Sequence, residues 1–298
     1  MSVRFKLKGI YTPVITPFHR DGSIDFDALA DLVERLVTAG VHGLISGGST
    51  GENYAETVEE RLAIARFVVD RVKGRIPVVI GTGAMRTPDS IALAVGARDM
   101  KADAILLGTP PYSVPTEREN ALNALAIDRA ADMPIILYNY PGRMSVAMGR
   151  EFLDRVGRSK NVIGIKESSG DINRVHLLAR DYPHIQMSCG MDDQALEFFA
   201  WGAQSWICGG SNFLPDEHIA LYDTCVVKGD FAKGRRIMSA ILPLMAVLEQ
   251  GGKFDLVILD AILPKLTGRE VFDQIRAREP HQPVLFCSGY SAGTLQPE

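Results

Sequence analysis

Short apolar runs rich in β-branched residues alternate along this chain with segments whose apolar residues recur at helical spacing. The runs follow one another at intervals of roughly 20–35 residues, as strands do in repeated strand–helix units. Because the runs are almost wholly apolar, they predict parallel strands that are covered by helices. Eight such units predict a closed (β/α)8 TIM barrel. The predicted strands are Ile10–Ile15, Gly43–Ser46, Val78–Gly81, Ala104–Leu107, Ile135–Tyr138, Val162–Lys166, Ile185–Ser188 and Ser205–Cys208.

Polar residues before the helical segments mark where the helices should begin. Thr57 and Thr116 are each followed three residues later by a glutamate, the spacing of a capping box, and Thr87-Pro88 predicts a cap with proline at the first helical position. The alternative fold is an open doubly wound sheet. That fold usually carries Gly-x-Gly-x-x-Gly after its first strand, and this chain does not.

The pattern changes twice after the eighth predicted strand. Residues 1–215 form the predicted barrel, and residues 216–252 form a C-terminal helical extension with one long helix from about Asp216 to Glu249. A glycine pair, Gly251-Gly252, then introduces an atypical tail over residues 253–298. The pattern of residues in this tail predicts a strand over Phe254–Asp260, a helix to about Arg278 and a strand over Pro283–Ser288.

Composition narrows the class of protein. The 298 residues are 46% apolar and 23% charged, which suits a folded chain with a sizeable core. A net charge of −4 without a basic stripe argues against a nucleic-acid partner, and no apolar run reaches the roughly 18 residues of a membrane span. No signal peptide is recognisable, and the four cysteines are widely spaced, so we expect a cytoplasmic protein with reduced thiols. The six histidines lack ligand spacing, so no metal is expected.

A lysine, Lys166, stands at the end of the apolar run Val162–Lys166. An ammonium group there loses hydration, which disfavours its charged form. A neutral amine attacks carbonyl groups, and a desolvated lysine is typical of enzymes that form Schiff bases. Taken alone, such a residue is more often a lysine that extends from a strand end to the surface. The residues at the other strand ends therefore decide the interpretation.

Several other strand ends carry polar groups, and in a barrel of this kind these ends meet at one face. The glycines and hydroxyls of Ser46–Glu52 can form an anion nest, although Gly-rich turns are common. Tyr138 should lie beside Lys166 and could relay protons, or it could be a core aromatic. Arg143 could bind a carboxylate or be a solvated loop charge. The remaining candidates, which could bind hydroxyls or simply cap helices, are Gly190, Asp192 and Ser211.

Three motifs in this order resemble the dihydrodipicolinate synthase / N-acetylneuraminate lyase family. They are Gly48-Ser49-Thr50-Gly51-Glu52, Tyr138-Asn139-x-Pro141 and Gly164-Ile165-Lys166-Glu167, and the resemblance runs from about Lys8 to Phe254. It implies a Schiff-base-forming lyase or synthase without a cofactor, in which Lys166 forms an imine with pyruvate or a related 2-keto acid. It further implies that Ser49 and Thr50 hold the carboxylate, and that Tyr138 transfers protons through Thr50 to Tyr112 of a neighbouring subunit in a dimer or tetramer.

The resemblance leaves the second substrate open. Arg143 matches the 4-hydroxy-tetrahydrodipicolinate synthases, where this arginine binds a carboxylate. Ser49 in place of threonine and Gly190-Met191-Asp192-Asp193 are closer to the sialate lyases, and Pro111 stands where the synthases usually carry a second tyrosine. Tyr138–Met144 also resembles the pyrroline-4-hydroxy-2-carboxylate deaminases. The alternatives are therefore such a deaminase or a sugar-acid aldolase or dehydratase, all acting through the same imine.

The tail suggests a function of another class. Asp255–Asp260 with the following Leu263-Pro264 and Gly268 resembles the middle of a response-regulator receiver domain, with Asp260 at the phosphoacceptor position. The acidic metal pocket of a receiver is absent, and a fragment of about 45 residues cannot bury enough surface to fold alone. A receiver-type signalling protein is thus the weaker hypothesis, and the tail is interpreted as a fusion or assembly artefact.

Overall fold

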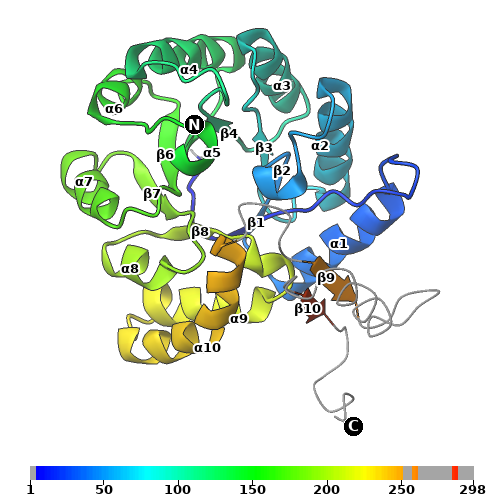
Figure 1. Ribbon diagram of the computed structural model, residues 1–298, viewed down its shortest axis with the longest axis vertical. Helices are drawn as coiled ribbons and strands as arrows, with labels where there is room; N and C mark the ends of the chain where they lie inside the picture. The colour runs from blue at the N-terminus through cyan, green and yellow to red at the C-terminus, as the bar shows by residue number, and fades with distance from the viewer. Residues whose placement is uncertain (1–4, 251–256, 261–283, 288–298) are drawn as a thin grey trace. The chain divides into compact units, whose positions relative to one another are not determined.

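The predicted strands close into one parallel barrel. A computed structural model describes residues 5–250, 257–260 and 284–287. Its first eight strands pair in chain order, and β1 returns to pair with β8, so that the ring visible in Figure 1 is complete. The (β/α)8 TIM barrel expected from the sequence is confirmed. The strands are β1 Gly9–Pro13, β2 Gly43–Ser46, β3 Val78–Gly81, β4 Ala104–Gly108, β5 Ile135–Asn139, β6 Val162–Glu167, β7 Gln186–Cys189 and β8 Ser205–Ile207.

Helices surround this ring (Figure 1) and begin largely where the polar signals predict. Both capping boxes form, at Thr57 with Glu60 and at Thr116 with Glu119. Thr87 is the first residue of its helix rather than the cap, which is Arg86. The helices are α1 Phe26–Ala39, α2 Val58–Val72, α3 Thr87–Asp99, α4 Glu117–Ala131, α5 Pro141–Met144, α6 Arg150–Val156, α7 Asn173–Asp181 and α8 Ala195–Ala200, with short turns η1 Ser49–Gly51 and η2 Gly210–Asn212.

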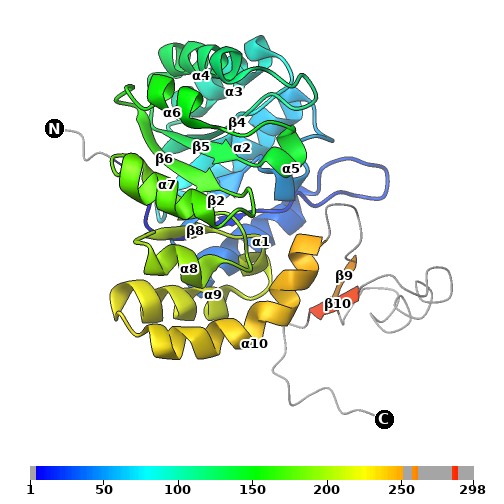
Figure 2. The same cartoon turned by 60° about the vertical axis from the view of Figure 1, so that its left-hand side comes forward.

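The long helix expected after the eighth strand is instead two helices. Helix α9 spans Pro215–Tyr222, a π-helical turn η3 spans Asp223–Val227, and α10 spans Phe231–Gln250. The break occurs because Gly229 adopts a left-handed φ of +70° and the Asp230 carboxylate then caps the next helix by accepting from Lys233 N at 2.9 Å. Figure 2 shows α9 and the start of α10 beside α8. No helix in the described parts of the chain is long and apolar enough to cross a membrane.

The chain divides into two compact units, Met1–Ile241 and Leu242–Glu298. In the second unit, strands β9 Val257–Asp260 and β10 Val284–Cys287 pair in parallel. Both lie within the strands predicted for the tail, and they pair with each other from Val257 with Val284 to Asp260 with Cys287. The predicted tail helix lies outside the described residues, and the boundaries at 215 and 252 stay predictions.

Candidate active site

The centre of the candidate site is a lysine and a tyrosine on neighbouring strands. Tyr138 of β5 and Lys166 of β6 are register partners, so their side chains leave the sheet on the same face. The Lys166 Nζ lies 4.5 Å from the centroid of the Tyr138 ring, and both residues are 6% exposed. Among the described residues, this amine makes no hydrogen bond or ion pair. The expectation that Tyr138 lies beside Lys166 is confirmed, and the amine is left available for chemistry.

The hydroxyl that contacts Tyr138 belongs to Ser49. Its Oγ lies 3.2 Å from the Tyr138 Oη, which corrects the link through Thr50 that the family resemblance implies. Thr50 lies near the end of β8, because a Cβ built on Gly209 would lie 3.9 Å from the Thr50 Oγ1. Ser49 and Tyr138 line a small cavity of about 60 Å³ that extends toward Pro111. Such a cavity is large enough to hold several water molecules and therefore a small ligand.

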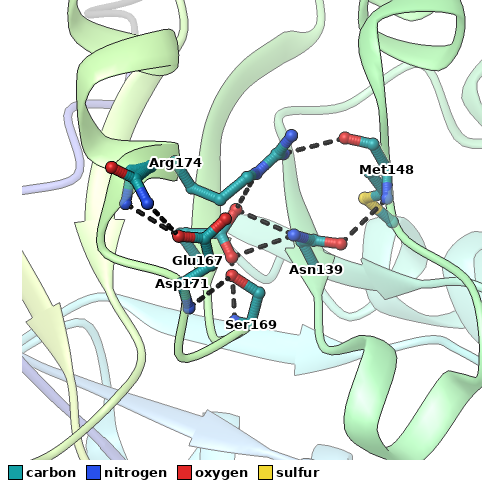
Figure 3. Close-up of polar contacts among 7 residues, drawn as sticks. Asn139, Met148, Glu167, Ser169, Asp171 and Arg174 are labelled. Atoms are coloured by element: carbon teal, nitrogen blue, oxygen red, sulfur yellow. Dashed lines mark hydrogen bonds and ion pairs between the residues drawn. The ribbon is translucent and has the colours of Figure 1, made fainter.

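On the opposite face of the same strand ends lies a polar cluster that the sequence analysis missed (Figure 3). The Glu167 carboxylate, 1% exposed, accepts from Asn139 Nδ2 at 2.9 and 2.8 Å, from Ser169 N at 2.8 Å and from Arg174 Nε at 3.1 Å. Asn139 Oδ1 accepts from Met148 N at 2.9 Å, and Arg174 donates to the Met148 carbonyl at 2.8 Å. Strand alternation beside Tyr138 and Lys166 was the signal that could have revealed it.

A buried carboxylate forms part of the wall at the end of β7 and β8. The oxygens of Asp192 accept from Gly210 N at 2.8 Å and from Trp206 Nε1 at 3.2 Å. Burial raises the pKa of Asp192 to about 6, although the Gly210 N–H and the Lys166 ammonium favour the charged form. Gly190 packs so closely on Lys166 that a Cβ there would lie 2.8 Å from the lysine Cγ. Gly190 therefore confines the lysine stem.

The other predicted site residues lie farther from this centre. Arg143 is exposed and stacks on Tyr140, with its Cζ 5.3 Å from the ring centroid. Tyr112 is 86% exposed and has a left-handed φ of +67°, so it points into solvent rather than into its own site. Ser211 is fully buried, and its hydroxyl donates to the Cys208 carbonyl and bonds to the Thr12 hydroxyl, each at 2.8 Å. The Ser211 hydroxyl is therefore bonded within the protein, and its role in substrate binding stays a prediction.

A larger hollow of about 490 Å³ lies elsewhere, at the C-terminal end of α2. It is lined by Arg71 and Arg75, which both pair with Glu34. In a parallel barrel the helix ends of this side lie at the face opposite the strand ends that carry the chemistry. We therefore take the smaller cavity, beside Tyr138, as the candidate site.

Known proteins resemble this chain over most of its length. The model of the dihydrodipicolinate synthetase family matches residues 6–284. A 4-hydroxy-tetrahydrodipicolinate synthase from Pseudomonas aeruginosa is 37% identical over 81% of this chain and 83% of its own length, and one from Cellvibrio japonicus is 37% identical over 80% and 82%. A crystal structure of chloride-inhibited dihydrodipicolinate synthase from Acinetobacter baumannii complexed with pyruvate is similar with a TM-score of 0.80 and 29% identity, covering 84% of this chain and 86% of that one.

These findings also bear on the tail. The family match continues to residue 284, past the Phe254 at which the resemblance was expected to end. The resemblance of the tail to a receiver domain is not borne out by the comparisons. The prediction of a lyase with the class I aldolase-like mechanism is confirmed at the level of the family. The chain belongs to the dihydrodipicolinate synthetase family.

Proposed function

We propose that this chain forms a Schiff base between Lys166 and pyruvate or a related 2-keto acid, and that it acts as a 4-hydroxy-tetrahydrodipicolinate synthase. The observation that carries the proposal is the amine of Lys166 against the ring of Tyr138, whose phenol bonds to Ser49. The names of the relatives support the synthase reaction, and the pyruvate complex of the similar Acinetobacter baumannii enzyme supports the keto acid.

The proposed reaction begins at the Lys166 amine. The nitrogen attacks the keto carbon, the carbonyl oxygen takes up a proton, and water leaves to give the imine. Loss of a proton from the neighbouring methyl group then gives an enamine, whose carbon attacks the aldehyde of the second substrate. Tyr138 is positioned to give and take the protons of these steps, because its phenol reaches the Ser49 hydroxyl at 3.2 Å.

Binding of the keto acid is assigned to the loop after β2. The hydroxyls of Ser49 and Thr50 are available for its carboxylate, as the family resemblance implies. Tyr112 supports a role for a second copy of the chain, since it is an exposed aromatic held at a φ of +67°, a conformation rare for bulky residues. We assign Tyr112 of a neighbouring copy to the proton path that ends at Ser49 and Tyr138, within a dimer or tetramer.

Arg143 bears on the second substrate, and the cysteines bear on the compartment. Arg143 is retained as the group that binds a second carboxylate, and its exposed position at the start of the loop after β5 suits an incoming substrate. The buried thiols Cys208 and Cys225, which form no disulfide, support a cytoplasmic location.

One observation favours a second candidate, cleavage of a hydroxylated 2-keto acid. Gly209 carries no side chain, and the space that a Cβ would fill lies 3.6 Å from the Asp192 Oδ2 and 3.9 Å from the Thr50 Oγ1. Asp192 and Thr50 thus flank the same glycine, and a carboxylate and a hydroxyl of this kind can bind a substrate hydroxyl. The synthase remains the first proposal, because relatives of that name match the chain over about four fifths of its length.

The test combines trapping with product analysis. The protein is incubated with pyruvate and reduced with borohydride, and mass spectrometry should find the adduct on the peptide that contains Lys166. Aspartate semialdehyde, a hydroxylated sugar acid and the pyrroline derived from hydroxyproline are then compared as second substrates. Fastest turnover with aspartate semialdehyde supports the synthase. An adduct on another residue, with Lys166→Ala fully active, would overturn the proposed site.

A further inference from the structure

The cluster on the helix-facing side of β5 and β6 is a closed circuit. Asn139 bonds to Glu167, Glu167 pairs with Arg174, Arg174 donates to the Met148 carbonyl, and the Met148 N–H donates back to Asn139. We call these four residues the outer cluster. They come from β5, β6, α7 and the segment before α6, and Figure 3 shows Asn139 and Arg174 converging on the Glu167 carboxylate, with Met148 joined to both of them.

The outer cluster sits one residue beyond the reactive pair. Tyr138 pairs with Lys166 in the sheet, and the next register pair is Asn139 with Glu167. Side chains alternate between the two faces of a strand. Contacts that hold Asn139 and Glu167 on the helix-facing side therefore also hold Tyr138 and Lys166 on the other side. A slip of one residue would exchange the faces and turn the Lys166 side chain away from the Tyr138 ring.

The pairing of β5 with β6 is irregular at the end away from the site. The pairing of β5 with β6 shifts between Ile135 and Ile136, at the opposite end of the strands from the site. An irregularity of this kind bends a strand and increases its local twist, so the continuous pairing toward the site begins only at Ile136 and Gly164. The Asn139–Glu167 bonds, at 2.9 and 2.8 Å, supply a side-chain lock where the ladder ends.

Lys166 has little room to compensate for a displaced strand. Gly190 confines its stem on one side, where a Cβ would come within 2.8 Å of the lysine Cγ, and the Tyr138 ring lies 4.5 Å from its Nζ. The backbone continues the restraint, since Ser168 N donates to the Asn139 carbonyl at 2.8 Å and Gly190 N to that of Glu167 at 2.9 Å. A movement of the β6 end is therefore passed directly to the amine.

We propose that Asn139, Glu167 and Arg174 are positioning residues that set the alignment of Lys166 with Tyr138 for imine formation. The inference rests on the proposed Schiff-base function and deepens it. Alignment matters because a displacement of about 1 Å in a reacting group can lower a rate by about 10²-fold. The cluster touches neither the pocket nor the substrate, so its effect should appear in the rate of bond formation rather than in substrate binding.

The experiment exchanges the amide and the carboxylate across the strand pair. Asn139→Asp places two carboxylates face to face, and Glu167→Gln turns an amide toward the donors of Asn139 and Arg174. In the double variant Asn139→Asp/Glu167→Gln, the glutamine can donate to the aspartate, which still accepts from Met148 N. The measurements are the rate of borohydride trapping by pyruvate, kcat, KM for pyruvate, and the melting temperature.

The other end of β6 offers a matched control. Asn161, just before β6, donates to the Asp128 carboxylate at 2.8 Å, so Asn161→Asp breaks the same kind of bond away from the site. We expect each outer-cluster single variant to slow trapping at saturating pyruvate by about 10–100-fold with KM changed less than about threefold. The double variant should recover at least about tenfold of that loss. Asn161→Asp should lower the melting temperature comparably yet trap at the wild-type rate.

Each outcome separates the positioning role from the proposed function. Wild-type protein that gives no adduct on Lys166 would refute the Schiff-base function itself. Two outcomes would overturn the positioning role alone, provided that the wild-type protein forms the adduct. One is a trapping rate in both folded single variants equal to that of the wild type, and the other is a double variant that recovers none of the lost rate. If a single variant fails to fold, Arg174→Lys replaces it, because lysine keeps the charge but cannot reach Glu167 and Met148 with the same fork. Trapping by Arg174→Lys at the wild-type rate would likewise overturn the proposal.

Discussion

The two faces of the β5 and β6 ends differ in how completely their polar groups are paired. On the helix-facing side, every polar atom of the Glu167 and Asn139 side chains has a partner. On the other face, Lys166 is nearly as buried, yet its amine, 4.5 Å from the centroid of the Tyr138 ring, makes no hydrogen bond among the described residues. The two pairs of residues are offset by one position along each strand. The comparison teaches that a fully satisfied cluster can hold a reactive, unsatisfied group in place, and that the two faces should respond oppositely to mutation.

The largest effect should come from removing the reactive amine. Lys166→Met should abolish adduct formation and turnover, because no other nucleophile of the proposed site replaces it. The same change should raise the melting temperature by about 2–4 °C, equivalent to about 1 kcal/mol, since it replaces a buried amine that makes no hydrogen bond among the described residues by an apolar side chain. Glu167→Met is the contrasting variant on the other face. It should destabilise by about 3–5 kcal/mol, because it leaves Arg174 half-buried and unpaired.

Calorimetry of the two variants tests the comparison directly. Loss of stability in Lys166→Met as large as in Glu167→Met would mean that the pocket face is also optimised for stability. The two faces of the β5 and β6 ends would then differ in the arrangement of their side chains and not in how much each contributes to stability.

Tyr138→Phe should give the next largest effect. Phenylalanine keeps the aromatic ring beside the Lys166 Nζ but removes the hydroxyl that bonds to Ser49. We expect kcat to fall by roughly 10²–10⁴-fold, as for loss of a general acid–base group, with the pyruvate KM changed much less. Steady-state kinetics and single-turnover trapping check this. A kcat within a few-fold of wild type would make Tyr138 a packing residue.

The pH dependence of stability should reveal two opposed groups around Trp206. The indole donates to Asp192 on one side and stacks on His218 on the other, with ring centroids 4.4 Å apart. Burial raises the pKa of Asp192 to about 6 and lowers that of His218 to about 4. The folded state therefore binds the extra proton at Asp192 between about pH 4 and 6, so this contribution is lost as pH rises. At His218 the unfolded state binds the extra proton between about pH 4 and 6.5, so stability rises with pH.

In the wild type these two slopes nearly cancel. Asp192→Asn should uncover the histidine, so that the free energy of unfolding rises by about 3 kcal/mol between pH 4 and 7. His218→Gln should uncover the aspartate and make the free energy of unfolding fall by a similar amount over that range. Urea unfolding at several pH values measures both. Parallel pH profiles for the two variants would show that neither group is shifted as burial implies.

The sequence predicts the barrel well because its signal is local. Strands covered on both faces are almost wholly apolar, and the predicted strands agree with β1–β8 to within about two residues. The break between α9 and α10 was missed, because helical spacing continues on both sides of it. Gly229-Asp230, a glycine stop followed by a capping aspartate, was the available signal.

The site was predictable only in part. Tyr138 and Lys166 follow from their places at the ends of consecutive strands, and the register pairs them directly. The partner of Glu167 does not follow in this way, because Arg174 comes from the next helix and its reach depends on how α7 packs. The choice between Ser49 and Thr50 depends on the turn η1. Adjacent side chains in a 3₁₀ turn point about 120° apart, and the turn's orientation is set by tertiary packing.

That choice gives the smallest of the expected effects and the finest test of the pocket face. Ser49→Ala removes the 3.2 Å contact with the Tyr138 Oη, and a hydrogen bond of about 1–1.5 kcal/mol corresponds to a fall in kcat of about tenfold. Thr50→Ala leaves that contact intact, so it should raise the pyruvate KM while kcat stays within about threefold. Ser49→Thr is the control, because threonine keeps the hydroxyl and should retain kcat. If Thr50→Ala instead lowers kcat more than Ser49→Ala, the proton path runs through Thr50 in the working enzyme, and the contact of Ser49 with Tyr138 serves only to orient the ring beside Lys166.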